Sequence, residues 1–295
     1  MKQLSIILSI IVALFILCCS SGPVDKKIVT VSIEPQRFLL EKVVGDKVQV
    51  RCLLTDGANP ETYDPSMTHM INLQKSSGYL RMGNIGFEAA LLDKIHDSDP
   101  DLPIYNTSSG IIPILGTHGH PGHSHEEIDP HTWTSLKNAR VIVTNMLNAM
   151  VEIDPDNRAY YQKNAKNYIA HLDSLHQALS QKLASKKGES FMVWHPSLSY
   201  FARDYGLNQL TMGGQSHKEN SIMDFKQSID SARQLGAKVF FHSSEFDPRQ
   251  VNAVNSELQA REVVIHPLTY EWEQEIINIA NAIAEGDSAS VANAK

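Results

Sequence analysis

The chain has 295 residues and a formal net charge of −7, with 42% hydrophobic and 20% charged residues. Because the charge is acidic and no basic stripe is present, the sequence argues against a nucleic-acid partner and is compatible with attraction of cations. Only three cysteines occur, two of them adjacent near the N-terminus. The sequence therefore offers no disulfide framework, and the fold must depend on a buried hydrophobic core.

The N-terminus resembles that of an exported bacterial lipoprotein. A lysine precedes a mostly apolar run that has the length of a signal-peptide core and is too short to span a bilayer comfortably. The run ends at Cys18 and Cys19, followed by Ser-Ser-Gly-Pro, which resembles a lipobox. We predict a signal peptide over residues 1–18, acylation of Cys19 and a tether over residues 19–27. Acylation of Cys18 and an uncleaved membrane anchor are the alternatives.

Short apolar runs alternate with helical patterns on both sides of one long helical segment. Strand–helix alternation predicts an α/β fold with mainly parallel sheets and helices on both faces. We expect an N-terminal lobe over residues 28–154 and a C-terminal lobe over residues 187–295. The predicted strands are 28–33, 48–54, 79–82, 191–195, 238–242 and 262–266, and the helical patterns include 66–76, 86–96, 224–235 and a C-terminal segment that starts near Trp272.

The long segment between the lobes carries a single apolar stripe, with steps of three and four residues from Tyr161 to Leu183. Asp154 suits the N-cap, and Pro155 suits the first helical position. A helix over residues 155–186 would be about 45 Å long, which is enough to cross a domain. We therefore predict a rigid helix that joins the two lobes.

Each apolar run of the second half ends in a histidine, namely His195, His242 and His266. The C-terminal ends of parallel strands line one edge of a sheet, and ligands of open α/β sheets bind beyond that edge. A single histidine at a strand end is more often structural. Three at equivalent places favour a binding site.

A second group of histidines lies in residues 117–125, a Gly/Pro segment without helical or strand periodicity. The segment directly precedes His131, and its histidines are His118, His120, His123 and His125. A flexible segment loses ordering entropy when it binds an ion, so any metal site in it should be weak. We expect an auxiliary loop that collects metal or senses its excess. A solvated loop without a role is the alternative.

Four segments together resemble the ligand-bearing segments of the zinc and manganese substrate-binding lipoproteins of ABC importers. The resemblance covers essentially the whole mature chain, including the long helix and the His-rich loop. It implies two lobes, one connecting helix, a metal ion in the cleft between the lobes, and a membrane permease as partner. The four segments are "GANPETYDP" (57–65), "DPHTW" (129–133), "HPSLSYFARDYGL" (195–207) and "VVIHPL" (263–268).

The resemblance also implies a set of metal ligands. His131 and His195 match family ligands directly, whereas Glu61 stands where the family carries histidine and His266 where it carries aspartate. The exchange keeps three imidazoles and one carboxylate. Water in place of Glu61 is an alternative, and so are His242 and Glu245 as supporting or replacement ligands.

This ligand set suits one tightly bound Zn²⁺, which accepts imidazole and carboxylate in tetrahedral geometry. Manganese prefers more oxygen ligands, and ligand type alone does not exclude copper or nickel. We expect a monomeric, non-enzymatic protein, anchored in the periplasm or on the cell surface, that captures zinc for an ABC importer. Alternatives are a manganese-binding protein of the same type, a zinc hydrolase with Glu61 or Glu245 as base, and a metal-regulated cell adhesin.

Overall fold

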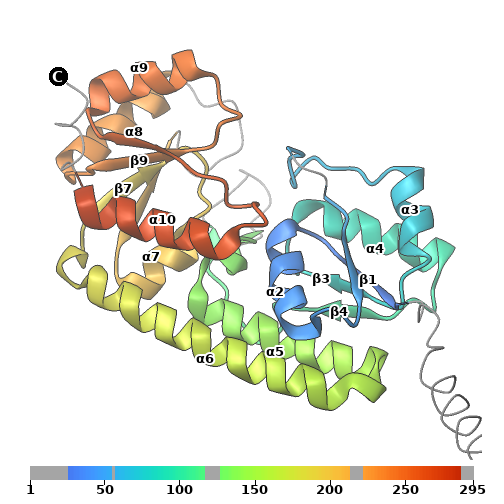
Figure 1. The fold of residues 1–295 in the computed structure, drawn as a ribbon. Helices are drawn as coiled ribbons and strands as arrows, with labels where there is room; N and C mark the ends of the chain where they lie inside the picture. Colours follow the sequence, from blue (N-terminus) through green and yellow to red (C-terminus); the bar gives the residue numbers. More distant parts are fainter. Residues whose placement is uncertain (1–25, 55–56, 117–126, 213–221, 287–295) are drawn as a thin grey trace, which may run out of the picture.

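Two parallel sheets lie side by side over a common pair of long helices (Figure 1). The computed structural model describes residues 26–54, 57–116, 127–212 and 222–286. The predicted signal peptide, Cys19 and the four loop histidines lie outside these residues. Within them, no helix combines the length and the apolar character that a membrane span requires.

The N-terminal lobe has a four-stranded parallel sheet of order β2-β1-β3-β4. Three of its strands were predicted, and β4 is additional. Three helices flank the sheet, and one of them, α2, packs on both long helices. The strands are β1 (Ile28–Val31), β2 (Gln49–Cys52), β3 (Tyr79–Arg81) and β4 (Ile104–Asn106), and the helices are α2 (Glu34–Val44), α3 (Met67–Leu73) and α4 (Gly86–Ser98).

The C-terminal lobe repeats the architecture with a parallel sheet of order β10-β9-β7-β8. A hairpin of β5 (Leu115–Gly116) and β6 (Glu127–Ile128) lies between the lobes in the chain. The two parallel sheets with their helices confirm the predicted α/β class. The strands are β7 (Ser190–Val193), β8 (Asn208–Thr211), β9 (Val239–His242) and β10 (Arg261–Val264), and the helices are α7 (Ser199–Tyr205), α8 (Ile222–Gln234), α9 (Pro248–Leu258) and α10 (Trp272–Glu285).

The strand ends correct one detail of the prediction. Only His242 is the last residue of its strand, whereas His195 and His266 each follow a strand that ended two residues earlier. The register pairs Val193 with Phe241 and Val264 with His242, so the three strands end at one edge of the sheet. The three histidines therefore lie at the same edge of the sheet, the one formed by the C-terminal ends of the strands, as expected.

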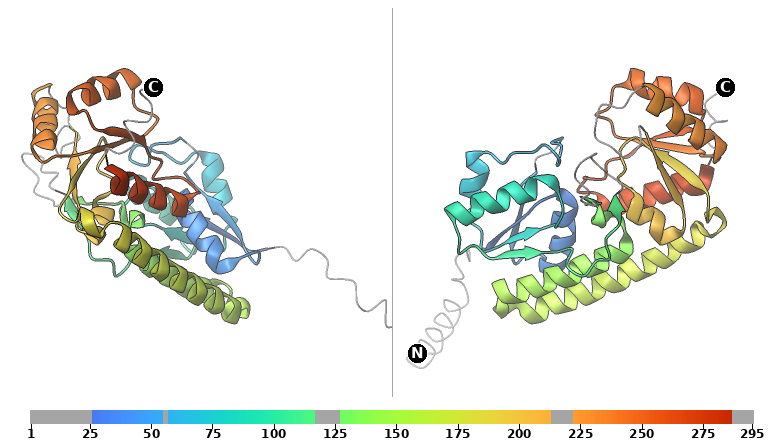
Figure 2. Two further views of the ribbon diagram at one scale, coloured as in Figure 1. Left: turned by 60° about the vertical axis from the view of Figure 1, so that its left-hand side comes forward. Right: turned by 180° about the vertical axis from the view of Figure 1, so that it is seen from behind.

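One long helix connects the lobes, as predicted, and a second long helix packs along it (Figure 2). Helix α5 (Leu136–Ile153) packs along α6 (Arg158–Lys182), which is about 38 Å long at 1.5 Å per residue. The predicted helix over 155–186 instead begins and ends in 3-10 turns, at Pro155–Asn157 and Ala184–Lys186. The residues of the apolar stripe are buried, except Leu175, which is partly buried.

Asp154 explains the break between the two long helices. Its φ of −140° is extended, and Pro155 restricts this geometry further and has no N–H to continue α5. The predicted side-chain cap is wrong, because no backbone N–H donates to this carboxylate at the helix start. It instead accepts hydrogen bonds from Asn157 Nδ2 at 2.7 Å and from the Tyr161 hydroxyl at 2.5 Å.

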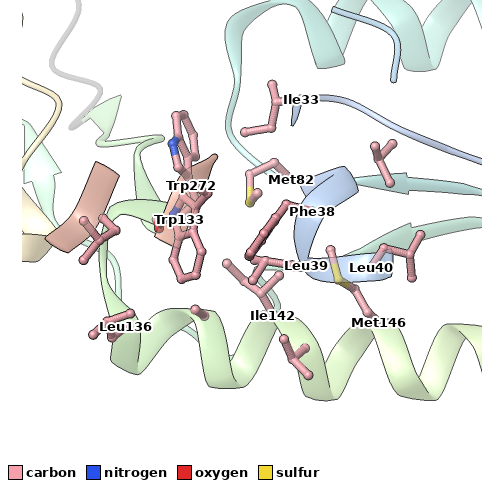
Figure 3. Packing of buried hydrophobic residues seen from close by; sticks show 14 of the residues in the cluster. Ile33, Phe38, Leu39, Leu40, Met82, Trp133, Leu136, Ile142, Met146 and Trp272 are labelled. Atoms are coloured by element: carbon pink, nitrogen blue, oxygen red, sulfur yellow. Dashed lines mark hydrogen bonds between the residues drawn. The ribbon is translucent and has the colours of Figure 1, made fainter. Parts of the chain in front are cut away.

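The larger of two buried hydrophobic clusters contains residues of both lobes (Figure 3), and the smaller one lies within the C-terminal lobe. Trp133 and Trp272 lie against each other beside Phe38 of α2, and both indoles are 1% exposed. The Trp133 indole N–H donates to the Pro267 carbonyl, and the Trp272 indole N–H donates to the Trp133 carbonyl, both at 2.8 Å. The ring centroids of Tyr270 and Phe38 are also 5.5 Å apart. The lobes are therefore joined by packed interior as well as by helices.

The pKa of Asp154 generates a stability prediction. Burial alone would raise this pKa, but hydrogen bonds from Tyr161, Asn157 and Lys27 hold it below the ordinary value of 3.8. A carboxylate with a lowered folded-state pKa stabilises the protein above its unfolded pKa, and this contribution is lost as the pH falls through the folded value. Asp154→Asn should cost about 1–3 kcal/mol at neutral pH, because hydrogen bonds to a charged group are lost.

Urea unfolding should give a difference between wild type and variant that is constant from about pH 7 to pH 5 and shrinks below about pH 4. Asp156→Asn, which removes the same charge from an exposed residue of the same turn, is the matched control and should have little effect. A difference that grows in acid would contradict this role of Asp154.

Candidate metal centre

A cleft of about 810 Å³ lies between the lobes, at the C-terminal ends of strands from both sheets. Its walls come from the loop after β2, the segment after β6, and the segments that follow β7, β9 and β10. The structure therefore brings every candidate site residue within the described ranges to one place. The six residues are Glu61, His131, His195, His242, Glu245 and His266.

His131 and His195 form the centre of this cleft. Their Nε2 atoms are 3.2 Å apart, and their ring centroids are 5.1 Å apart at an interplanar angle of 73°. Two nitrogens bound at 2.0–2.1 Å to one tetrahedral zinc ion are about 3.3 Å apart. The two lone-pair positions therefore converge at the spacing that a shared ion requires, although the histidines are 64 residues apart in the chain.

The position of His131 follows from the tripeptide Asp-Pro-His. The Asp129 carboxylate oxygen Oδ1 accepts hydrogen bonds from the His131 backbone N–H at 2.9 Å and from Nδ1 at 2.8 Å. Side-chain oxygens of aspartate commonly form such turns with the residue two positions on. With Nδ1 engaged, Nε2 of His131 is the nitrogen that faces the cleft. Sequence reasoning missed this role of Asp129, and the available signal was an acidic residue two positions before a ligand candidate.

Asp129 is ionised around neutral pH. Burial alone would raise the pKa of Asp129, but the side-chain, charge and backbone interactions with His131 bring it below its usual value. The Glu34, Glu61 and Glu245 side chains also line the cleft. The site thus combines imidazole nitrogens with nearby carboxylates, which favours a divalent cation over an anion.

Glu61 lies beside the histidine pair. Its Oε1 is 3.7 Å from His195 Nε2, and its backbone N–H donates to the Asn59 side chain at 2.8 Å. Gly86 at the start of α4 lets this loop approach closely, because a Cβ there would lie 3.3 Å from the Glu61 carbonyl oxygen. The Glu61 side chain is 41% exposed. It therefore has room to move the short distance toward the two nitrogens.

The other three candidate residues differ in their exposure and in their hydrogen bonds. His266 is exposed on the cleft wall, and its backbone N–H donates to Glu275 of α10 at 2.6 Å. His242 is buried, and both ring nitrogens are engaged, with the Ser243 carbonyl and with the Glu262 carboxylate, each at 3.0 Å. Glu245 lines the cleft just beyond β9. This bonding makes His242 a wall residue as the side chains stand.

Among the described residues, no three side chains of His, Cys, Asp or Glu already stand together in an arrangement that could hold a metal ion. The pair His131–His195 is formed, and Glu61 is next to it. Completing a four-ligand set requires the side chains of Glu61 and His266 to turn toward the pair.

The fold and the cleft agree with comparisons to known proteins. The high-affinity zinc uptake system protein ZnuA of Bacillus subtilis is 27% identical over 258 residues, which cover 83% of this chain and 79% of that protein. The zinc-binding lipoprotein AdcA of Streptococcus pneumoniae is 27% identical over 288 residues, which cover 93% of this chain. The match covers 57% of AdcA, so the chain spans little more than half the length of that relative.

A solved structure and a family model extend the likeness to the whole fold. The crystal structure of a ZnuA deletion mutant with zinc bound superimposes with a TM-score of 0.81 at 32% identity, and the match covers 90% of this chain and 99% of that one. The family model of ZnuA, the periplasmic component A of the zinc-uptake complex, matches residues 29–285. The resemblance seen in the sequence is confirmed, and the chain belongs to the family of periplasmic zinc-uptake component A proteins.

Proposed function

We propose that the protein captures zinc outside the cytoplasm in the inter-lobe cleft and delivers it to an ABC-type membrane importer. The observation that carries this proposal is the convergence of His131 and His195, with Nε2 atoms 3.2 Å apart in a cleft that also holds carboxylates. The names of the relatives, which refer to zinc uptake and zinc binding, support the choice of metal. The relative named a lipoprotein supports export and acylation at Cys19.

The proposed ligands are Glu61, His131, His195 and His266. Three neutral imidazoles and one carboxylate match the nitrogen and oxygen donors that zinc accepts, and the carboxylate cancels one of the two charges of the ion. Four protein ligands occupy every tetrahedral position. A catalytic zinc site keeps one position open for water or substrate, so this set supports capture and release, not hydrolysis.

Manganese is the second candidate metal, and one observation favours it. Glu34 and Glu245 line the same cleft as Glu61, so the cleft offers further oxygen donors. Manganese prefers more oxygen ligands than the four proposed residues provide. Parallel titrations with both ions decide between the two metals.

A competitive zinc titration of the mature protein at neutral pH should detect one tight site. Glu61→Ala and His266→Ala should each weaken it by more than the roughly 10–100-fold that loss of an outer hydrogen-bond partner costs, because each removes a direct ligand. Glu257→Ala and His171→Ala remove the same side-chain types from exposed positions outside the cleft and serve as controls.

Tight binding that Glu61→Ala leaves unchanged would give the fourth position to water or to Glu245. If the wild type binds manganese tightly but not zinc, manganese would replace zinc as the proposed metal. Absence of both would overturn metal capture and favour a structural role at the cell surface.

Zinc affinity should fall as the pH is lowered, because an imidazole must be neutral to bind the ion. The sign follows from competition: each histidine ligand that gains a proton loses the lone pair that binds zinc. Competition titrations at about pH 7.5, 6.5 and 5.5 should show more than one proton taken up for each zinc ion released. The dependence should become shallower in His195→Ala. Equal affinity at all three pH values would contradict a site with three imidazoles.

The His-rich segment over residues 117–125 lies outside the described residues, so its role rests on composition and on its place before His131. Deleting residues 117–125 should leave the tight site intact and remove weaker binding, because ordering a Gly/Pro segment around an ion costs conformational entropy. Calorimetric titration with excess zinc would measure both classes of site. Loss of the tight site on deletion would contradict the idea of an auxiliary loop.

A further inference from the structure

Asp129 lies behind the proposed metal ligand His131 and is itself held by the opposite lobe. Its carboxylate oxygen accepts from both the backbone N–H and Nδ1 of His131, at 2.9 and 2.8 Å. A carboxylate in this position keeps the proton on Nδ1 and leaves the Nε2 lone pair directed away from it. In this structure the Nε2 atom faces His195 Nε2. The orientation of the histidine pair therefore depends on where Asp129 lies.

Helix α7 of the C-terminal lobe determines the position of Asp129. The Tyr200 hydroxyl donates to the Asp129 carbonyl at 2.9 Å and accepts from the Ile114 N–H at 3.1 Å, so one side chain joins the segments on both sides of the β5–β6 hairpin. Tyr200 is fully buried, and the Arg203 guanidinium lies 4.9 Å from the centre of its ring. These contacts fix the backbone of Asp129 from the opposite lobe.

A second anchor reaches the Asp129 carboxylate through Ser199. Gln209 of β8 donates from Nε2 to the Ser199 hydroxyl oxygen at 2.9 Å, while its Oε1 accepts from the Leu198 N–H at 2.7 Å. The amide orientation of Gln209 is thereby fixed, and the Ser199 hydroxyl proton remains to be donated. Hydrogen bonding from the Ser199 side chain is one of the causes that lower the pKa of Asp129. Ser199 thus connects Gln209 of β8 with the carboxylate that contacts His131.

The same helix follows the other ligand segment. His195 precedes α7 by four residues, and its carbonyl accepts from the Ser197 N–H at 2.7 Å in the turn between them. One short stretch of the C-terminal lobe therefore carries one imidazole and holds the partner of the other. If the lobes separated, Asp129 would lose Ser199 and Tyr200 together.

We propose that Asp129 is the positioning residue for His131, and that Ser199 and Tyr200 hold it so that the two imidazoles are paired in advance while the lobes are docked. This inference rests on the proposed function, because it concerns the same metal site. A carboxylate bound to a metal-ligating histidine fixes the ring orientation and raises its basicity, and loss of such a partner typically costs about 10–100-fold in metal affinity.

A purely structural role for Asp129 makes a different prediction. Asparagine forms the same turns as aspartate with the backbone N–H two residues on. If Asp129 only shaped the turn, Asp129→Asn would leave zinc binding unchanged. If the charge and acceptor strength act on His131, Asp129→Asn should weaken zinc binding by about 10–100-fold in a folded protein.

The test is a zinc titration of the mature protein with wild type, His131→Ala, Asp129→Asn, Ser199→Ala and Tyr200→Phe. Ser199→Ala and Tyr200→Phe should each weaken binding by about fivefold, the value of one hydrogen bond. The Ser199→Ala effect should disappear in the Asp129→Asn background, because both act through one carboxylate. Tyr205→Phe is the matched control, since this buried tyrosine of the same helix contacts His176 instead of Asp129.

A spectroscopic readout separates positioning from general damage. Long-range ¹H–¹⁵N spectra of the metal-free protein should show the His131 proton on Nδ1 in wild type and in Tyr205→Phe, and loss of that preference in Asp129→Ala. Circular dichroism would verify that each variant is folded. If Asp129→Ala does not fold, the Ser199→Ala and Tyr200→Phe affinities decide the matter.

The outcomes separate this inference from the proposed function. If wild type lacks a tight site, metal capture itself fails. If wild type binds tightly, His131→Ala abolishes binding and Asp129→Asn retains full affinity, the positioning role is overturned while metal capture stands. If the losses of zinc affinity caused by Ser199→Ala and Asp129→Asn are additive in the double variant, the link through Ser199 is overturned.

Discussion

The joint between Trp133 and Trp272 is the interaction on which the proposed site depends. His131 lies two residues before Trp133, and the Trp133 indole donates to Pro267, the residue after His266. The second indole donates back to the Trp133 carbonyl. The two segments that carry His131 and His266, proposed as metal ligands, therefore meet at one buried contact. Both indoles contribute large apolar area there, and both indole N–H groups are satisfied. Without the contact between Trp133, Pro267 and Trp272, nothing in this part of the core would fix the position of His131 relative to His266.

The continuous core limits how the site can open. The interior that joins the lobes is packed from α2 through the tryptophans to the long helices, and close-packed interiors resist gradual deformation. The Glu61 side chain is 41% exposed, and His266 is exposed on the cleft wall. Exchange of metal is therefore easiest through these side chains and their loops. We expect the His131–His195 pair to stay in place, because Asp129 holds His131 and is itself contacted by Tyr200 of α7, while His195 lies in the turn before that helix.

Much of this arrangement was predictable because it depends on local patterns. Apolar runs indicated most strands, and the common edge of parallel strands indicated that His195, His242 and His266 would share a cleft. Strand β8 reads Asn-Gln-Leu-Thr and β4 has three residues, so neither carries a period that reveals it. The 3-10 turns at the two ends of the connecting helix were missed because they lie outside the apolar stripe from Tyr161 to Leu183, so its period does not mark them. The partners of His242 and Asp129 depend on strand register and on helix docking, which one sequence does not encode locally.

The shared core has a consequence for how such proteins diversify. Each lobe has its own sheet and α6 leads from one lobe to the other, an arrangement that at first suggests exchange of halves between relatives. A recombinant with a crossover in α6 would inherit Trp133 from one parent and the Pro267–Trp272 segment from the other. Its core would mismatch wherever the parents differ at this joint. Diversification of metal preference should therefore proceed by paired substitutions in both halves, of the kind that the proposed exchange at Glu61 and His266 would represent, and not by shuffling of lobes.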